Sequence, residues 1–298
     1  MRLGPFLASE LGRDLKCARH RCQVISLITP HVPSRAGLII ETWRSILDQD
    51  VEWEWLIQID GQRCADLPDG LLSDARIQVE ENGEQLGIAN TRNLALSRAK
   101  GEFVYPIDDD DILLEGALQN LQKALAEHPD CAGATGIPLF YDGQGFAEWT
   151  KCGVSIKDTY AVPGRVEIEG CYSRRRDLGS HLLASGTGFL WRSEAIWKAG
   201  GWPALSGAED SALLFQINAS NPIYIIDKET LGYRVHSGQE SQSDEIIKKR
   251  DRLGVFMARM SAAVAGSLVR IPVEKPKTLE GTSNLHYRPR ASGKRDRE

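Results

Sequence analysis

The sequence has few cysteines, and they follow no pattern. The 298-residue chain contains six, and none of them forms a C-x-x-C pair. Structural zinc sites and disulfide scaffolds depend on regular cysteine spacing, so neither is expected to organise this fold. We expect reduced thiols, as in a cytoplasmic protein.

Long hydrophobic runs are missing as well. The apolar stretch at residues 3–11 is interrupted by Pro5 and Glu10, and it is too short for a secretory signal or a membrane span. We therefore expect a cytoplasmic protein with no integral membrane segment. It would reach a membrane-linked acceptor only as a peripheral protein at the inner membrane face.

A surplus of basic charge is also lacking. The formal net charge is −5, whereas nucleic-acid-binding proteins present a broad basic surface. No nucleic-acid partner is expected. The hydrophobic content of 42% is ordinary for a soluble globular protein, and the length suffices to bury a core in one large domain or two small ones.

Strand-like and helix-like segments alternate through the first half of the chain. Apolar or β-branched runs predict strands at 23–30, 55–61, 75–79 and 102–107, and amphipathic segments predict helices at 34–49 and 88–99. This alternation, which continues to residue 127, predicts an α/β fold with a mostly parallel sheet flanked by helices.

The pattern becomes irregular from about residue 137. Strands are predicted at 181–191 and 223–226, and helices at 193–199, 210–218 and 242–265. We divide the chain into a flexible leader (1–22), two halves of one domain (23–136 and 137–240), a C-terminal helix (241–270) and a disordered basic tail (271–298).

Four consecutive aspartates, residues 108–111, directly follow the predicted strand 102–107. Adjacent carboxylates repel unless solvent, a cation or a positive partner relieves them. One interpretation is a solvated loop in which Asp110 or Asp111 caps a helix beginning near Ile112. The other is a site for a hard divalent cation, with Asp108 and Asp110 on the same side of an extended segment.

The position of the run favours the cation site. Ligands of parallel sheets bind at the carboxyl ends of the strands, and Asp60 ends a second predicted strand at the same edge. Two further acids, Glu209 and Asp210, begin a predicted helix, where acids also stabilise a helix without any further role. His236 lies in a polar stretch and is either structural or a group that completes a cation site.

Several segments, in order, resemble glycosyltransferase family 2. Residues 87–104 are similar to its G-x-x-x-A-R-N element, and residues 107–111 resemble its D-x-D-D motif. Residues 189–192 with 200–202 are similar to its acceptor-side segment. Glu209-Asp210 and residues 233–236 are similar to its E-D motif and late histidine. The resemblance covers residues 23–240.

The resemblance implies a GT-A fold and inverting transfer of a sugar from a nucleoside-diphosphate sugar to an acceptor hydroxyl. Residues 23–136 would form the nucleotide-sugar-binding half, and 137–240 the acceptor-binding and catalytic half. The roles it implies are a general base, Asp210; ligands of Mn²⁺ or Mg²⁺, namely Asp108, Asp110 and His236; nucleotide-sugar contacts, namely Thr29, Pro30, Asp60, Arg92, Asp108, Asp109 and Asp110; and acceptor-side residues, namely Glu209, Trp202 and Arg192.

One departure leaves the nucleotide open: the family often has two acids before its glycine at the second strand, whereas this chain has Ile59-Asp60-Gly61. Two other functions remain open at this stage. One is an aspartyl-phosphate-type phosphatase that uses Asp108 and Asp110, and the other is a non-catalytic sugar-nucleotide binding module. The sequence also leaves open the sugar, the acceptor (a small molecule, a glycan or a lipid-linked glycan), homo-oligomerisation, and the roles of Arg174-Arg175-Arg176 and of segment 138–185.

Overall fold

The computed structural model describes residues 23–35, 37–62, 67–142, 145–146, 159–161, 187–205, 207 and 209–236. The chain divides into two units, Met1–Ser267 and Leu268–Glu298, and every described residue belongs to the first. The predicted leader, C-terminal helix and tail, the arginine run 174–176 and most of segment 138–185 lie outside the described residues.

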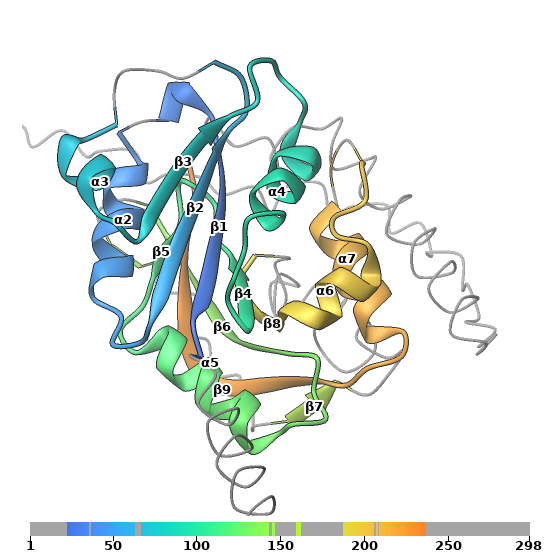
Figure 1. The fold of residues 1–298 in the computed structure, drawn as a ribbon. Coiled ribbons are helices and arrows are strands. Elements are labelled where there is room, and N and C mark those ends of the chain that lie inside the picture. The colour runs from blue at the N-terminus through green and yellow to red at the C-terminus, as the bar shows by residue number, and fades with distance from the viewer. Residues whose placement is uncertain are drawn as a thin grey trace, which may run out of the picture. The chain divides into compact units, whose positions relative to one another are not determined.

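A mixed sheet runs through the described part of the chain (Figure 1). One half consists of four parallel strands in the order β3-β2-β1-β4, namely β1 (Ile25–His31), β2 (Trp53–Ile59), β3 (Ile77–Glu81) and β4 (Phe103–Pro106). The other half continues as β8-β6-β9-β5. Its strands are β8 (Phe189–Arg192), β6 (Gly133–Tyr141), β9 (Ile223–Arg234) and β5 (Ile112–Leu113), with β7 (Thr159–Ala161) also paired to β9.

Helices cover both faces of this sheet. On one face, α2 (Ile39–Leu47), α3 (Asp69–Ser73) and α5 (Ala117–Glu127) share a core with strand residues such as Trp55 and Tyr105. On the other, α4 (Ile88–Leu96), α6 (Ser193–Ala199) and α7 (Glu209–Asn218) pack with Leu56 and Trp191 (Figure 1). Burial on both faces explains why the central parallel strands β1, β2 and β4 are mostly apolar. The predicted α/β class is confirmed.

The prediction of a helix directly after the aspartates is wrong. Ile112 and Leu113 form β5, which pairs antiparallel with β9, and α5 begins only after Gly116, whose φ is 66°. Asp111 therefore does not cap a helix. Its neighbours are drawn into a strand because β9 offers an open edge to Ile112 and Leu113.

Several other elements differ from their predicted bounds. β9 is twelve residues long and reaches Arg234, whereas the sequence predicted a strand only at 223–226. The exposed Asp227-Lys228-Glu229 segment resembles a strand end, yet pairing with its neighbours carries the strand through it. The predicted helix 34–49 is divided into a short 3₁₀ turn, η2 (Pro33–Arg35), and α2, and the strand predicted at 75–79 is shifted to 77–81.

Candidate functional site

The carboxyl end of β4 is held to its neighbours by buried polar side chains. Thr29 in β1 donates its hydroxyl to the carbonyl of Ile107 (2.8 Å) and accepts a hydrogen bond from the Trp55 indole (2.8 Å). Both hydrogen-bonding directions of Thr29 are thus used within the fold, and Pro30 beside it is also buried. These two residues lie beneath the aspartates, and they form the support of the site.

Asp109 faces back into the protein. Its Oδ2 accepts hydrogen bonds from His31 Nδ1 (2.8 Å) and the backbone NH of Val32 (3.1 Å), and its Oδ1 lies 3.4 Å from Arg35 Nη1. The side chain is almost completely buried. Asp109 therefore fixes the connection between β1 and η2 against the aspartate run.

Asp108, Asp110 and Asp111 converge. Each offers one carboxylate oxygen, and these oxygens all lie within 4.8 Å of one another. The backbone NH of Arg234 donates to Asp111 Oδ1 (2.9 Å), whereas the buried Oδ2 of Asp111 has no hydrogen-bond partner. Burial, followed by the nearby carboxylates of Asp110 and Asp108, raises the pKa of Asp111 well above its ordinary value.

Such a cluster fits a hard cation. Oxygen ligands suit Mg²⁺ and Mn²⁺, and a buried acceptor without a donor is costly unless something binds it. His236 Nε2 lies 2.9 Å from Asp110 Oδ2, so it adjoins the cluster through Asp110. The three sequence candidates for metal ligation thus lie together, and Asp111 joins them.

Arg92 connects this cluster to α7. Its Nη2 donates to Asp108 Oδ1 and its Nη1 donates to Glu209 Oε1, both at 2.5 Å. Only 2% of the Arg92 side chain is exposed, and each terminal nitrogen already donates to a protein carboxylate. Burial raises the pKa of Asp108, although the positive charge of Arg92 acts to lower it. Burial also raises the pKa of Glu209 to about 7, again against the attraction of Arg92.

Asp210 follows Glu209 in the first turn of α7. Its Oδ1 accepts a hydrogen bond from the backbone NH of Ser211 at 2.5 Å, and its side chain is half-buried. Because Glu209 is engaged by Arg92, Asp210 is the more accessible of the two adjacent acids.

Asp60 organises the loop that leads into α4. Its carboxylate accepts hydrogen bonds from the backbone NH groups of Leu86 (2.7 Å) and Gly87 (3.2 Å) and from the Asn82 side chain (3.1 Å). Gly87 adopts a φ of 82°, which favours glycine. Asp60 therefore shapes the edge of the site beside Arg92's helix.

Residues 26–197, more than half of the chain, match Glycosyl transferase family 2. The chain belongs to this family. It is 32% identical over 154 residues to the putative teichuronic acid biosynthesis glycosyltransferase TuaG of Bacillus subtilis (strain 168). It is also 26% identical over 112 residues to the glycosyltransferase GlyG of Streptococcus pneumoniae serotype 4 (strain ATCC BAA-334 / TIGR4).

These matches cover only part of each protein. The TuaG match spans 50% of this chain and 60% of TuaG, and the GlyG match spans 35% and 36%. Among solved structures, S. aureus TarS 1-349 in complex with UDP-GlcNAc has a TM-score of 0.57 at 21% identity, covering 78% of this chain and 66% of that one. The structural likeness confirms the GT-A fold expected from the family resemblance.

Arg192 and Trp202, two predicted acceptor-side residues, are both held within the fold by hydrogen bonds. Arg192 pairs with Phe103, the first residue of β4, so it lies at the opposite end of that strand from the aspartates. Its guanidinium donates to the carbonyls of Cys131 and Leu125 beyond and within α5. Trp202 is buried in the core, and its main chain is bound on both sides by the Asn93 side chain. The structure does not bring Arg192 to the site.

Several residues of the site were missed from sequence. His31 and Arg35 bind the aspartates from the end of β1, and Asn82 binds Asp60. Arg234 donates its Nε to the Asp110 carbonyl (2.7 Å) and its Nη2 to Glu41 (2.7 Å). Only Arg234 stood within a recognised motif. The others are separated by 22 to 78 positions in the sequence from the residues they bind.

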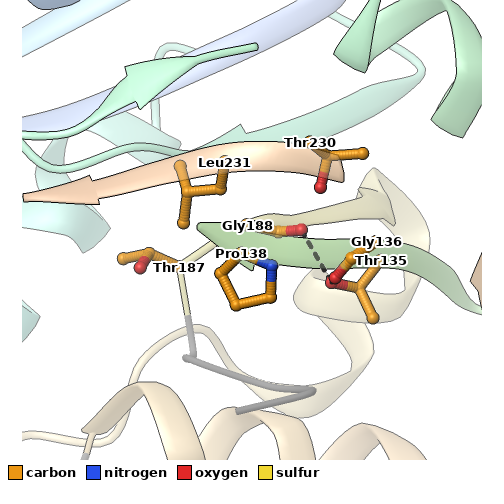
Figure 2. Close-up of a pocket in the computed structure, with 7 residues that line it drawn as sticks. All are labelled: Thr135, Gly136, Pro138, Thr187, Gly188, Thr230 and Leu231. Carbon is orange, nitrogen blue, oxygen red and sulfur yellow. Dashed lines mark hydrogen bonds between the residues drawn. The ribbon is translucent and has the colours of Figure 1, made fainter. Parts of the chain in front are cut away.

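Two recesses lie outside the aspartate cluster. A narrow crevice between β6, β9 and the start of β8 has no room for a water-sized sphere, and the hydroxyl of Thr135 donates across it to the Gly188 carbonyl (2.9 Å) (Figure 2). It is a packing feature. A wider cavity of about 600 Å³ lies between α2 and β5, and Glu41 contributes to its wall. No helix in the described part of the chain is both long and apolar enough to cross a membrane.

Proposed function

We propose that the protein transfers a sugar from a nucleoside-diphosphate sugar to an acceptor hydroxyl, with inversion at the anomeric carbon. Membership of Glycosyl transferase family 2 supports this proposal, as does the similarity to TuaG, which is named as a glycosyltransferase. The family match favours this chemistry over an aspartyl-phosphate-type phosphatase. In the division of labour we propose, residues 23–136 bind the donor and 137–240 bind the acceptor.

The observation that carries the proposal is the contact of two distant motifs through one side chain. Arg92 donates to Asp108 of the aspartate run and to Glu209 of the E-D pair. Asp210 follows Glu209 directly in the chain. A carboxylate cluster suited to a cation therefore lies next to a separate, half-buried carboxylate, and metal-assisted inverting transfer uses both.

The aspartate cluster fits a divalent cation, Mn²⁺ or Mg²⁺. Asp108 and Asp110 would hold it, with His236 against Asp110 and the partnerless oxygen of Asp111 close by. The cation would neutralise charge that develops on the departing diphosphate, which stabilises the transition state more than the ground state.

Asp210 is proposed as the general base. It would take the proton of the acceptor hydroxyl while that oxygen forms a bond to the anomeric carbon and the bond to the diphosphate breaks. Glu209 is less suited to this role, because Arg92 occupies its carboxylate. The acceptor would be a small molecule, a glycan or a lipid-linked glycan.

Donor binding can be tested before the acceptor is known. UDP-GlcNAc is the first donor to try, because a TarS structure was determined with it. A panel of UDP-, GDP- and dTDP-sugars, each with and without Mn²⁺, should raise the melting temperature for the true donor only, since ligand binding stabilises the folded state. Absence of a shift with every nucleotide would count against the proposal.

Asp210→Asn tests the chemistry. We expect nucleoside diphosphate release in the presence of acceptor to fall by about 10²–10⁴-fold, the usual contribution of a general base, while donor affinity stays unchanged. The matched control is Asp227→Asn, an exposed aspartate in β9, which should turn over like the wild type. Near-normal turnover of Asp210→Asn would remove Asp210 from the mechanism.

A further inference from the structure

Arg35 holds an unusual place at the aspartate cluster. It ends η2, and its Nη1 lies 3.3 Å from Asp110 Oδ2 and 3.4 Å from Asp109 Oδ1. Both distances exceed the usual range of charge-assisted hydrogen bonds. The side chain is 24% exposed, whereas that of Arg92 is 2% exposed. Of these two arginines, Arg35 alone can be reached from solvent.

The two aspartates depend on Arg35 to different degrees. Asp109 keeps His31 and the backbone NH of Val32 as donors if Arg35 leaves. Asp110 Oδ2 keeps only His236 among the contacts described for it. Arg35 is attracted by both carboxylates, but Asp110 Oδ2 depends on it more, because only one other group contacts that oxygen.

A divalent cation at Asp110 would compete with this guanidinium. The two positive charges would lie within a few ångströms of each other, where their repulsion is strong in a partly buried site. The arginine then keeps Asp109 but loses Asp110, so it can pair with another anion. A diphosphate bound to the same cation supplies one, and a guanidinium binds phosphate oxygens through two parallel hydrogen bonds.

We propose that Arg35 is a substitute cation that neutralises Asp110 while the site is empty and binds the donor diphosphate when a divalent cation takes its place. The inference rests on the proposed function. It makes Arg35 a donor-binding residue that links two events. The cation alone takes Asp110 from Arg35 and leaves it Asp109 only, whereas the cation and diphosphate together give Arg35 a new partner. Cation and nucleotide should therefore bind cooperatively.

Arg35→Gln should change the two affinities in opposite directions. Mn²⁺ alone, titrated by electron paramagnetic resonance on the full chain, should bind several-fold more tightly, because no arginine competes for Asp110. UDP in saturating Mn²⁺, measured by calorimetry, should bind about tenfold or more weakly, because a charge-assisted contact to phosphate is lost. Arg35→Lys, which keeps the charge, should leave Mn²⁺ affinity near that of the wild type and weaken UDP less.

The matched control is Arg76→Gln. Arg76 is also ion-paired to an aspartate, Asp74. It precedes β3, which runs parallel to β2, so it lies at the opposite end of these strands from Asp60. It should change neither affinity, and melting curves of all variants report whether each remains folded. If Arg35→Gln weakens Mn²⁺ and UDP together, or changes neither, the inference is wrong while the proposed function stands. A wild-type chain that binds neither Mn²⁺ nor any nucleotide would overturn both.

Discussion

The two halves of the sheet are built differently, and the site lies where they meet. In the parallel half, β1 and β2 pair without interruption from Ile25 and Trp53 to His31 and Ile59. In the mixed half, the pairing of β6 with β9 shifts register between Thr135 and Pro138. Regular pairing fixes strand ends closely, whereas an irregular pair can re-aim the chain that follows it.

Both halves contribute charged groups to the site. The parallel half presents Asp60 and the aspartate run at its strand ends. The mixed half supplies Arg234 and His236, which contact Asp110 and Asp111, and Glu209, which binds the same arginine, Arg92, as Asp108. Neither half has a complete site alone, so contacts across the junction should be the most sensitive to substitution.

The largest effect is expected from Arg92→Met, which cuts the ion pairs that cross the junction. Asp108 and the buried Glu209 would each lose their arginine partner. Removing one partner of a buried ion pair costs about 3–5 kcal/mol, because an uncompensated charge stays behind. Urea denaturation would measure the loss in the free energy of unfolding.

The control for Arg92 is Lys198→Met, which removes an exposed pair with Glu194 within α6. Exposed pairs of this spacing contribute about 0.3–0.5 kcal/mol, so this variant should stay close to the wild type. The double variant Arg92→Met/Glu209→Met should recover part of the stability. If Arg92→Met is no less stable than Lys198→Met, the junction does not depend on Arg92.

A smaller effect is expected from pH, through Glu209. Burial raises the pKa of Glu209 from 4.5 to about 7, so the folded protein keeps this proton at pH values where the unfolded chain has lost it. The free energy of unfolding should therefore fall as pH rises from about 4.5 to about 7, by an amount on the order of 3 kcal/mol. Chemical denaturation at a series of pH values would show the slope.

Glu209→Gln should remove this part of the pH dependence, because its amide does not titrate. Glu194→Gln, on the exposed surface of α6, should keep the full decline of the wild type. Equal slopes in wild type and Glu209→Gln would show that Glu209 is ionised throughout the range and that the junction holds a full negative charge there.

The same contrast explains what could be predicted from sequence. Strands of the parallel half were located to within a few residues, because burial on both faces makes them continuous apolar runs. β9 was predicted at a third of its length, since exposed Asp227, Lys228 and Glu229 interrupt its apolar pattern. Strand pairing on both of its edges decides that length, and pairing is invisible in a single sequence.

The site shows a similar limit. Asp108, Asp110, Asp210 and His236 could be singled out because each stands in a local motif. Arg35 could not be singled out, because nothing near it in the sequence indicates a partner 75 positions away. Arg92 was found from its motif, yet its contacts to Asp108 and Glu209 depend on how the fold places α4 and α7 over the same core, and they required the structure.

The smallest expected effect compares two glycines, one from each half. A Cβ at Gly101 would lie 2.5 Å from the Val24 carbonyl beside β1, and a Cβ at Gly136 would lie 2.5 Å from the Lys228 carbonyl in β9. Overpacking of this kind typically costs about 1–3 kcal/mol. We expect the loss of stability for Gly101→Ala to fall at the upper end of this range, because regular parallel neighbours cannot yield. The loss for Gly136→Ala should fall at the lower end, because the register shift beside it can absorb the displacement.

Gly37→Ala, which meets no atom within 4 Å, is the control and should stay within about 0.5 kcal/mol of the wild type. Thermal and urea unfolding of the three variants would rank them. Equal losses at Gly101 and Gly136 would show that the irregular half is as rigid as the parallel one. The position of Arg234 and His236 at the site would then follow from the length of β9 alone.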